Sequence, residues 1–176
     1  MGLREDLERI IRDVPDFPKK GIVFKDITPI LQNPKVFKQV TDAITARFAP
    51  EKIDAVASVE SRGFLIGTPV AINLGVPFVP LRKSGKLPWD KISEEFTLEY
   101  GTATIEIHKD AIRKGQRVLI TDDLLATGGT AVASAKLVEK LGGVVAGFAF
   151  IVELGFLKGA GKLSKYNIYS LINYGD

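Results

Sequence analysis

The feature that most constrains the fold is the stretch 118–130, which reads Val-Leu-Ile-Thr-Asp-Asp-Leu-Leu-Ala-Thr-Gly-Gly-Thr. Its apolar, β-branched beginning predicts a buried strand. The apolar spacing from Ala131 to Leu141 predicts a helix directly after it. A strand, a loop and a helix start in this order indicate an α/β protein, whose ligands meet loops at the carboxyl ends of the strands.

The loop of this unit has the composition of a phosphate site. Gly128 and Gly129 permit backbone conformations that other residues avoid, so successive N–H groups can point into one concavity at the start of the helix. Thr127 and Thr130 add hydroxyl donors. A glycine pair alone is usually a turn, but the combination with the strand and the helix favours a ligand loop.

Two carboxylates precede this loop and define what the phosphate is attached to. Asp122 and Asp123 would repel a bare phosphate, but they accept hydrogen bonds from a vicinal diol. The alternative is a solvated carboxylate or a helix N-cap. Together with the loop, the two acids predict a ribose 5-phosphate as the ligand.

Composition limits the class of protein. The 176 residues are 45% hydrophobic, enough for one domain with a substantial core, so we expect a single domain over 1–176. The chain has no cysteine, which excludes disulfides and fits a reducing compartment. The amino terminus does not resemble a signal peptide, and the longest strongly apolar run, 144–152, is too short to cross a bilayer. We expect a soluble, cytoplasmic protein without membrane association.

Charge indicates the kind of ligand. A net charge of +3 suits a polyanionic ligand, but the basic residues are spread along the chain, so we expect no nucleic-acid partner. His108 is the only histidine. A histidine-based metal site or a Ser-His-Asp triad is therefore poorly supported, and we expect His108 to be a polar residue near a strand end.

The remaining pattern alternates helices with strands and predicts a mostly parallel central sheet flanked by helices. An amphipathic helix should run from Leu3 to Val14 and stop before Pro15. The other predicted elements are a helix after Asn33 ending near Pro50, a strand at 53–59, a helix at 64–74, a strand at 76–81, a two-stranded arm at 95–107 interrupted by Gly101, and strands at 144–154 and 166–174.

Two predicted strands end at basic residues. Arg62 would offer a fixed positive charge beside a helix amino terminus, which suits pyrophosphate, although a surface ion pair is the alternative. Arg82, Lys83 and Lys86 follow the strand at 76–81 and, taken alone, fit a solvated rim.

A second glycine-rich stretch, 158–163, superficially suggests a nucleotide loop. It lacks the upstream glycine of the Walker pattern, and Leu163 stands where that pattern has Ser or Thr. We expect a basic turn there.

The stretch 118–130 resembles the phosphoribosyl-pyrophosphate (PRPP) motif of the type I phosphoribosyltransferases, and its Asp-Leu-Leu is most similar to the adenine phosphoribosyltransferases. The segment 15–29, with Pro-Asp-Phe-Pro and Gly-Ile-Val-Phe-Lys-Asp-Ile-Thr-Pro, and the triplet Glu99-Tyr100-Gly101 extend the resemblance, which covers 15–154. It implies the type I phosphoribosyltransferase fold, with a small hood at about 15–33 and a mobile β flap at about 84–107.

The resemblance also implies a reaction: adenine and PRPP give AMP and pyrophosphate, in purine salvage. Mg2+ would bind mainly through PRPP and water, without a dedicated protein site, and the protein would be a homodimer. Glu99 would be the catalytic acid or base and Tyr100 an accessory residue of the flap. The resemblance further implies a cis peptide at Glu60-Ser61, and Arg82 could reach the site of a neighbouring subunit.

The remaining site residues implied by the resemblance fall into three groups. Phe24 would stack on adenine, the backbone of Val23 and Lys25 would pair with its edge, and Leu154 would form an apolar wall. Pyrophosphate would contact Arg62, Lys83 and Lys86. The ribose phosphate would contact Asp122, Asp123, Ala126, Thr127, Gly128, Gly129 and Thr130.

Two alternative functions stay open. One is a phosphoribosyltransferase for another base such as xanthine. The other is a non-catalytic, purine-responsive regulator, against which stands the short region before Ile53, with little room for a DNA-binding domain.

Overall fold

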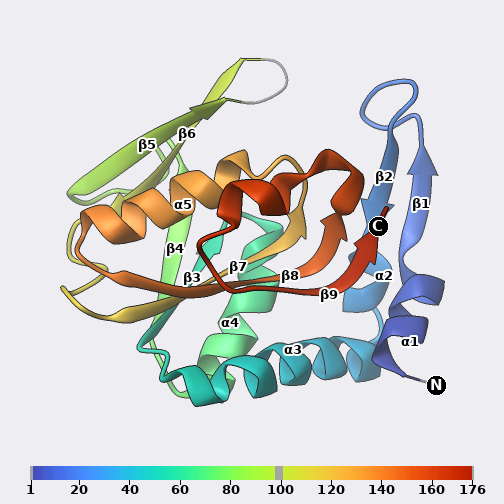
Figure 1. The fold of residues 1–176 in the computed structure, drawn as a ribbon, viewed down its shortest axis with the longest axis horizontal. Helices are drawn as coiled ribbons and strands as arrows, with labels where there is room; N and C mark the ends of the chain where they lie inside the picture. The colour runs from blue at the N-terminus through green and yellow to red at the C-terminus, as the bar shows by residue number, and fades with distance from the viewer. Residues whose placement is uncertain (1, 98–100, 176) are drawn as a thin grey trace.

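The structure is a computed structural model and describes residues 2–97 and 101–175. Within these residues, seven strands form one sheet in the order β5-β6-β4-β3-β7-β8-β9 (Figure 1). Strands β3, β4, β7, β8 and β9 are parallel, and β6 joins them antiparallel to β4. The strands are β3 (Ala55–Val59), β4 (Phe78–Lys83), β5 (Lys91–Thr97), β6 (Thr102–His108), β7 (Arg117–Leu125), β8 (Val144–Leu154) and β9 (Ile168–Tyr174). The predicted mostly parallel α/β sheet is confirmed.

Helices cover both faces of the sheet, because side chains on neighbouring strand positions point to opposite faces. Val56 and Leu119 pack in the core beneath α1 to α4, whereas Ala57 and Ile120 pack in the core beneath α5. The helices are α1 (Leu3–Ile10), α2 (Thr28–Leu31), α3 (Pro34–Phe48), α4 (Arg62–Leu74) and α5 (Gly129–Lys140), with short 3-10 turns η1 (Ala49–Glu51), η2 (Gly155–Leu157) and η3 (Gly159–Leu163). None of the helices in the described part of the chain has the length and apolar character needed to cross a bilayer.

The amino-terminal segment departs from the prediction of one helix up to Val14. Helix α1 ends at Ile10, and β1 (Arg12–Pro15) pairs antiparallel with β2 (Val23–Asp26) to form a separate two-stranded ribbon. Val14 precedes a proline, which disfavours the helical conformation and favours an extended one. The prediction was wrong because the cross-strand partner at 23–26 is invisible to a local helical pattern.

The order of the strands places the site. From β3 the chain crosses to β4 on one side, and it later returns to β7 on the other side of β3. Ligands in open α/β sheets bind where the strand order reverses in this way, at the carboxyl ends of the strands. The loop after β3 and the loop after β7 therefore lie side by side at the carboxyl ends of these two central strands.

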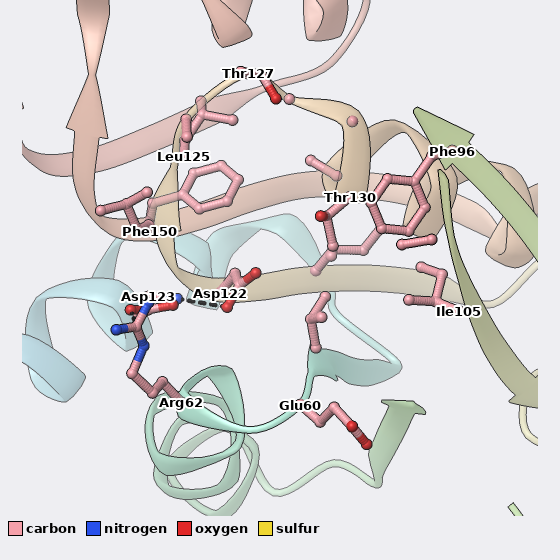
Figure 2. A pocket seen from close by; sticks show the side chains of 18 of the residues that line it. Glu60, Arg62, Phe96, Ile105, Asp122, Asp123, Leu125, Thr127, Thr130 and Phe150 are labelled. Atoms are coloured by element: carbon pink, nitrogen blue, oxygen red, sulfur yellow. Dashed lines mark hydrogen bonds and ion pairs between the residues drawn. The ribbon is translucent and has the colours of Figure 1, made fainter. Parts of the chain in front are cut away.

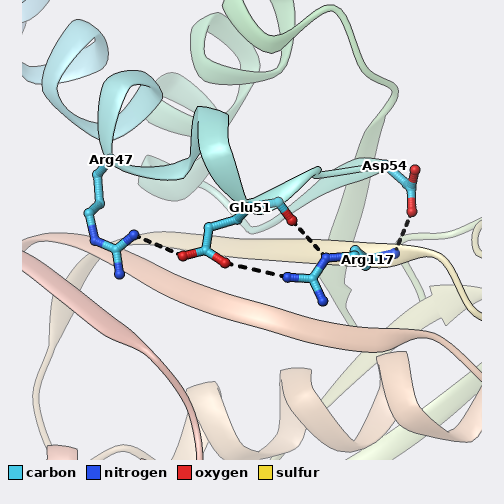
Figure 3. Close-up of polar contacts among 4 residues, drawn as sticks. All are labelled: Arg47, Glu51, Asp54 and Arg117. Carbon is cyan, nitrogen blue, oxygen red and sulfur yellow. Dashed lines mark hydrogen bonds and ion pairs between the residues drawn. The ribbon is translucent and has the colours of Figure 1, made fainter.

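The amino-terminal ends of the same two strands are held together by charged groups (Figure 3). Arg117 Nε donates to the Glu51 carbonyl at 2.7 Å, and the Arg117 N–H donates to Asp54 Oδ2 at 2.8 Å. Glu51 also pairs with Arg47 at 3.1 Å. These contacts join η1 and the turn before β3 to the start of β7, so the register of the two central strands is held at the end away from the site.

A buried pair of hydroxyls joins β3 to β7 nearer the site. Ser58 Oγ and Thr121 Oγ1 share a hydrogen bond, and both residues are fully buried. Gly67 of α4 lies directly above them, since a Cβ there would come within 2.6 Å of Thr121 Oγ1. The absence of a side chain at Gly67 lets α4 approach the sheet closely.

We predict that Ser58 and Thr121 are energetically coupled. Ser58→Ala or Thr121→Val alone leaves one buried hydroxyl without its partner and should lower the free energy of unfolding by about 1–3 kcal/mol. The double variant should cost clearly less than the sum of the two single changes, as measured by urea denaturation. Additive losses would contradict the coupling.

Candidate active site

A cavity of about 630 Å3 opens at the carboxyl ends of β3, β4 and β7 (Figure 2). Its wall combines the start of α4, the end of β7 with its loop, and parts of β5 and β6. The lining residues are Val59, Glu60, Ser61, Arg62, Lys83, Phe96, Ala103, Thr104, Ile105, Ile120, Asp122, Asp123, Leu124, Leu125, Ala126, Thr127, Gly128, Gly129, Thr130, Ala131, Phe148 and Phe150. Sequence positions from 59 to 150 thus meet at the strand-order reversal.

The residues 126–130, here called the phosphate loop, form one wall of the cavity and lead into α5. Gly128 has φ +79° and is the residue before the helix, and its carbonyl accepts the first helical hydrogen bond, from Val132 N–H at 3.0 Å. The N–H groups of the first helical turn have no carbonyl partner within the helix. The loop therefore presents backbone donors at the positive end of α5, an arrangement that binds phosphate.

Gly159 supports the phosphate loop from behind, and sequence reasoning missed it. A Cβ at Gly159 would overlap the Ala126 carbonyl and lie 2.9 Å from Gly128 N, while a Cβ at Gly128 would lie 2.7 Å from the Gly159 carbonyl. The two backbones are thus in direct contact. The stretch expected to be a basic turn forms η3, and its first residue fixes the shape of the loop. The sequence signal for this contact is the glycine itself, and its closeness to Ala126 depends on how the chain folds.

The acid pair Asp122 and Asp123 lies on the last part of β7, which continues to Leu125 rather than ending before the acids. Arg62 Nε lies 2.7 Å from Asp123 Oδ2, an ion pair without the alignment of a hydrogen bond. The Asp123 N–H donates to Asp122 Oδ1 at 2.9 Å. A Cβ at Gly63 would lie 2.9 Å from Asp122 Oδ1, so only glycine allows the start of α4 to approach the acids this closely.

The surroundings of Asp122 shift the pKa of its carboxyl group. Desolvation within the cavity wall, and secondly the negative charge of Asp123, raise the pKa of Asp122 well above its usual value. The charge of Arg62 opposes this rise. Asp122 therefore holds a proton more readily than an exposed carboxylate would. When both groups are ionised they can accept hydrogen bonds from hydroxyl groups, and a positive charge bound beside them would offset their mutual repulsion.

Arg62 also connects the cavity to the β1–β2 ribbon. Its guanidinium carbon lies 5.1 Å from the centre of the Phe24 ring, which in turn packs edge-on against Phe17 at 5.2 Å. Val23 beside it is 50% exposed. Lys25 is half-buried, with its ammonium 2.6 Å from Asp13 and 3.9 Å from the Tyr174 ring. The side chain of Lys25 thus connects the ribbon to the end of β9. Its backbone is the part for which the sequence predicts a contact with adenine.

The other predicted site residues are dispersed. Lys83 lines the cavity, whereas Lys86 and the half-buried Leu154 are not part of its wall. Arg82 Nε pairs with Glu60 Oε2 at 2.7 Å within the same chain. The peptide Glu60-Ser61 is cis. Glu99 and Tyr100 lie outside the described residues.

Sequence reasoning also missed the aromatic part of the wall. Phe96 of β5 lies at the phosphate loop, 3.3 Å from where a Gly129 Cβ would stand. Phe150 of β8 also lines the cavity and lies opposite Asp122 in the register of β7 and β8 (Figure 2). Phe96 was readable only as one apolar position of an alternating strand, and Phe150 only as core. Their contribution to the cavity depends on strand order, which no local pattern encodes.

Comparisons with known proteins agree with this geometry. The family model described as a phosphoribosyl transferase domain matches residues 26–173, and the chain belongs to the phosphoribosyltransferase family. A protein of Caldanaerobacter subterraneus subsp. tengcongensis named adenine phosphoribosyltransferase is 56% identical over 170 residues, 97% of this chain and 98% of the relative. Within the family, the chain is thus similar over nearly its full length to adenine phosphoribosyltransferases.

Solved structures give the same result. The adenine phosphoribosyltransferase of Thermoanaerobacter pseudethanolicus has a TM-score of 0.94 and 55% identity, and the match covers 97% of this chain and 99% of that one. The Saccharomyces cerevisiae enzyme, solved with adenine and D-2,5-dideoxy-2,5-imino-altritol 1,6-bisphosphate, has a TM-score of 0.93 and 41% identity, covering 97% and 98%. The type I phosphoribosyltransferase fold is confirmed.

The contact behind the phosphate loop leads to a prediction for Gly159→Ala. The added methyl group must displace the Ala126 carbonyl, which moves the loop, so the affinity for ribose 5-phosphate should fall at least about tenfold in calorimetric titrations. Gly161→Ala is the matched control in the same turn, because a Cβ there meets nothing within 4 Å. Equal affinities for Gly159→Ala and the control would refute the support role.

The raised pKa of Asp122 predicts a stability effect of Asp122→Asn. In the wild type, stability should fall as pH rises from the ordinary value of 3.8 through the raised pKa, since only the unfolded state ionises freely in that range. The amide keeps an acceptor for the Asp123 N–H without the charge. Thermal unfolding should show the variant more stable above that range, by about 2–4 °C for each kcal/mol of relieved repulsion, with a smaller difference near pH 4. A wild type that is the more stable protein at pH 8 would contradict this account.

Proposed function

We propose that this protein transfers the phosphoribosyl group of PRPP to adenine, giving AMP and pyrophosphate in purine salvage. The observation that carries the proposal is the position of the acid pair next to the phosphate loop at the strand-order reversal. The relatives named adenine phosphoribosyltransferase, and the yeast structure with adenine, support the choice of base.

The ribose phosphate has two complementary contacts in this proposal. Backbone N–H groups and hydroxyls of Ala126, Thr127, Gly128, Gly129 and Thr130 bind the 5-phosphate. Asp122 and Asp123 accept hydrogen bonds from the ribose hydroxyls. As the bond to pyrophosphate breaks, positive charge develops at the anomeric carbon, and the two nearby carboxylates stabilise it. The cost of holding these like charges together in the free protein is thus offset in the transition state.

The pyrophosphate side of the cavity is cationic. Arg62 and Lys83 line it, and we assign Lys86, on the turn that follows β4, to the same group. Among residues 2–97 and 101–175, no three His, Asp or Glu side chains gather as a metal site. In this proposal the ligands of Mg2+ are PRPP oxygens and water. When bound, Mg2+ would neutralise negative charge on the departing pyrophosphate. Arg62 and Lys83 orient the diphosphate and compensate its remaining charge.

Adenine binds under the β1–β2 ribbon, the core of the proposed hood at about 15–33. Phe24 stacks on the ring, and the backbone of Val23 and Lys25 pairs with its Watson–Crick edge, with Leu154 as an apolar wall. The proximity of Phe24 to Arg62, and the exposed Val23, support this placement. A 6-oxo purine would present donors and acceptors in the wrong order and leave buried groups unpaired.

The flap at about 84–107 supplies Glu99 as acid or base and Tyr100 as an accessory residue. The end of β5 supports this, since the Thr97 carbonyl lies 3.1 Å from where a Gly129 Cβ would stand. Glu99 would move the proton of the purine as N9 attacks, and the flap would exclude water from the activated sugar.

The proposal also includes the organisation of the protein in the cell. We infer one domain over 1–176, a homodimer, and a cytoplasmic location. Leu65 and Ile72 leave an apolar strip of α4 exposed, with Ile72 73% accessible, which supports a contact with a second subunit. Arg82 pairs with Glu60 of the cavity wall, and we assign it a contact with the partner's site.

The direct test is turnover with defined bases. The purified protein, Mg2+, PRPP and radiolabelled adenine should give labelled AMP, while hypoxanthine, guanine and xanthine should be converted at least about 100-fold less efficiently, because they leave hood groups unpaired. Preferred turnover of xanthine would replace adenine as the substrate. Specific operator binding in a mobility-shift assay without any AMP formation would favour the regulator instead.

A further inference from the structure

Glu106 is a buried carboxylate that none of the roles above uses. It lies on β6, is only 5% exposed, and faces the connection between β4 and β5. Its Oε1 accepts from Ser84 Oγ at 2.8 Å, its Oε2 accepts from Gly85 N–H at 3.1 Å, and Lys91 Nζ lies 3.9 Å from Oε2. A carboxylate is costly to bury, and it persists there only because donors surround it.

These contacts hold both ends of the connection. Ser84 and Gly85 stand directly after β4, and Lys91 begins β5. Lys91 Nζ also donates to the Leu87 carbonyl at 3.0 Å, which extends the network into the middle of the segment. Gly85 has φ +80°, a conformation that favours glycine, so a tight turn is built over the carboxylate.

The turn directly follows Lys83, a cationic residue of the cavity wall. Lys83, which lines the cavity, immediately precedes Ser84 and pairs with Ile105, the neighbour of Glu106 on β6. The Ser84 N–H donates to the carbonyl of Thr104, another lining residue, at 3.1 Å. Glu106 thus fixes the backbone of the turn that joins Lys83 to Lys86, and the donors around its carboxylate compensate its negative charge.

We propose that Glu106 is a positioning residue for pyrophosphate recognition: it anchors the turn 84–86 so that the adjoining lysines meet the diphosphate. This inference rests on the proposed function. Ordering the turn in the free protein reduces the entropy lost on binding. Binding of the ribose phosphate and of the purine should not depend on it, because the proposed contacts come from the phosphate loop and acid pair on β7 and α5 and from the hood on the β1–β2 ribbon, whereas Glu99 of the flap acts on turnover.

The test separates the two halves of the reaction. Calorimetry would measure dissociation constants for magnesium pyrophosphate and for AMP, and steady-state kinetics would measure KM for PRPP and for adenine. Glu106→Ala should weaken pyrophosphate binding and raise KM for PRPP at least tenfold, with AMP binding and KM for adenine within twofold of wild type. Glu106→Gln keeps an acceptor oxygen and should restore most of the affinity. Ser84→Ala, which removes one donor and leaves the buried acid in place, should show a smaller loss of the same kind.

Glu94→Ala is the matched control on the adjacent strand. Glu94 pairs with Lys136 at 2.8 Å and Lys140 at 2.5 Å. Its loss therefore removes ion pairs from β5, the strand next to β6, without changing the contacts of the turn. It should leave both dissociation constants unchanged. Pyrophosphate affinity equal to wild type in folded Glu106→Ala and Ser84→Ala, or equal losses for AMP and pyrophosphate, would overturn the positioning role. A wild type that bound neither ligand would instead defeat the proposed function itself, and this inference with it.

Discussion

The ion pair between Arg62 and Asp123 is the contact on which the rest of the site depends. It joins the first residue of α4 to the end of β7 across the strand-order reversal, at 2.7 Å. Two adjacent carboxylates in a partly desolvated wall are unfavourable, and a fixed cation is the simplest compensation. The same guanidinium lies against Phe24, so one side chain connects the acid pair, the side proposed for pyrophosphate and the ribbon proposed as the purine hood. A change at Arg62 would therefore affect all three, whereas the proposed role of Glu106 concerns only the pyrophosphate side.

Close backbone approaches matter as much as the charged groups. Gly63 brings the start of α4 against Asp122, and Gly159 brings η3 against the phosphate loop. In each case a methyl group would displace atoms that contact the ligand in the proposed mechanism. The fold thus fixes the backbone of the cavity wall by omitting side chains on the elements behind it. In the proposed mechanism, the positive charge that develops during the reaction compensates the unfavourable acid pair.

Much of this was readable from the sequence, for identifiable reasons. The strand, acids, glycines and helix at 118–140 are consecutive, so their local order was predictable, and the sheet class followed from the alternation of elements. The end of the first helix was wrong because β1 depends on a partner strand eleven residues further on. Phe96, Gly159 and Glu106 were missed because each acts across the fold, on a segment distant in sequence. Glu106 reads locally as one polar position in an alternating strand, and only the antiparallel pairing with β4 places it beneath the turn after Lys83.

The central claim is that the acid pair and the phosphate loop bind one nucleotide together. A crystal structure of the protein with AMP tests it most directly. The account predicts the 5′-phosphate within hydrogen-bond distance of backbone N–H groups at 126–130, with the ribose hydroxyls donating to Asp122 and Asp123 and the base beside Phe24. A nucleotide bound elsewhere, with both carboxylates facing bulk water, would contradict it.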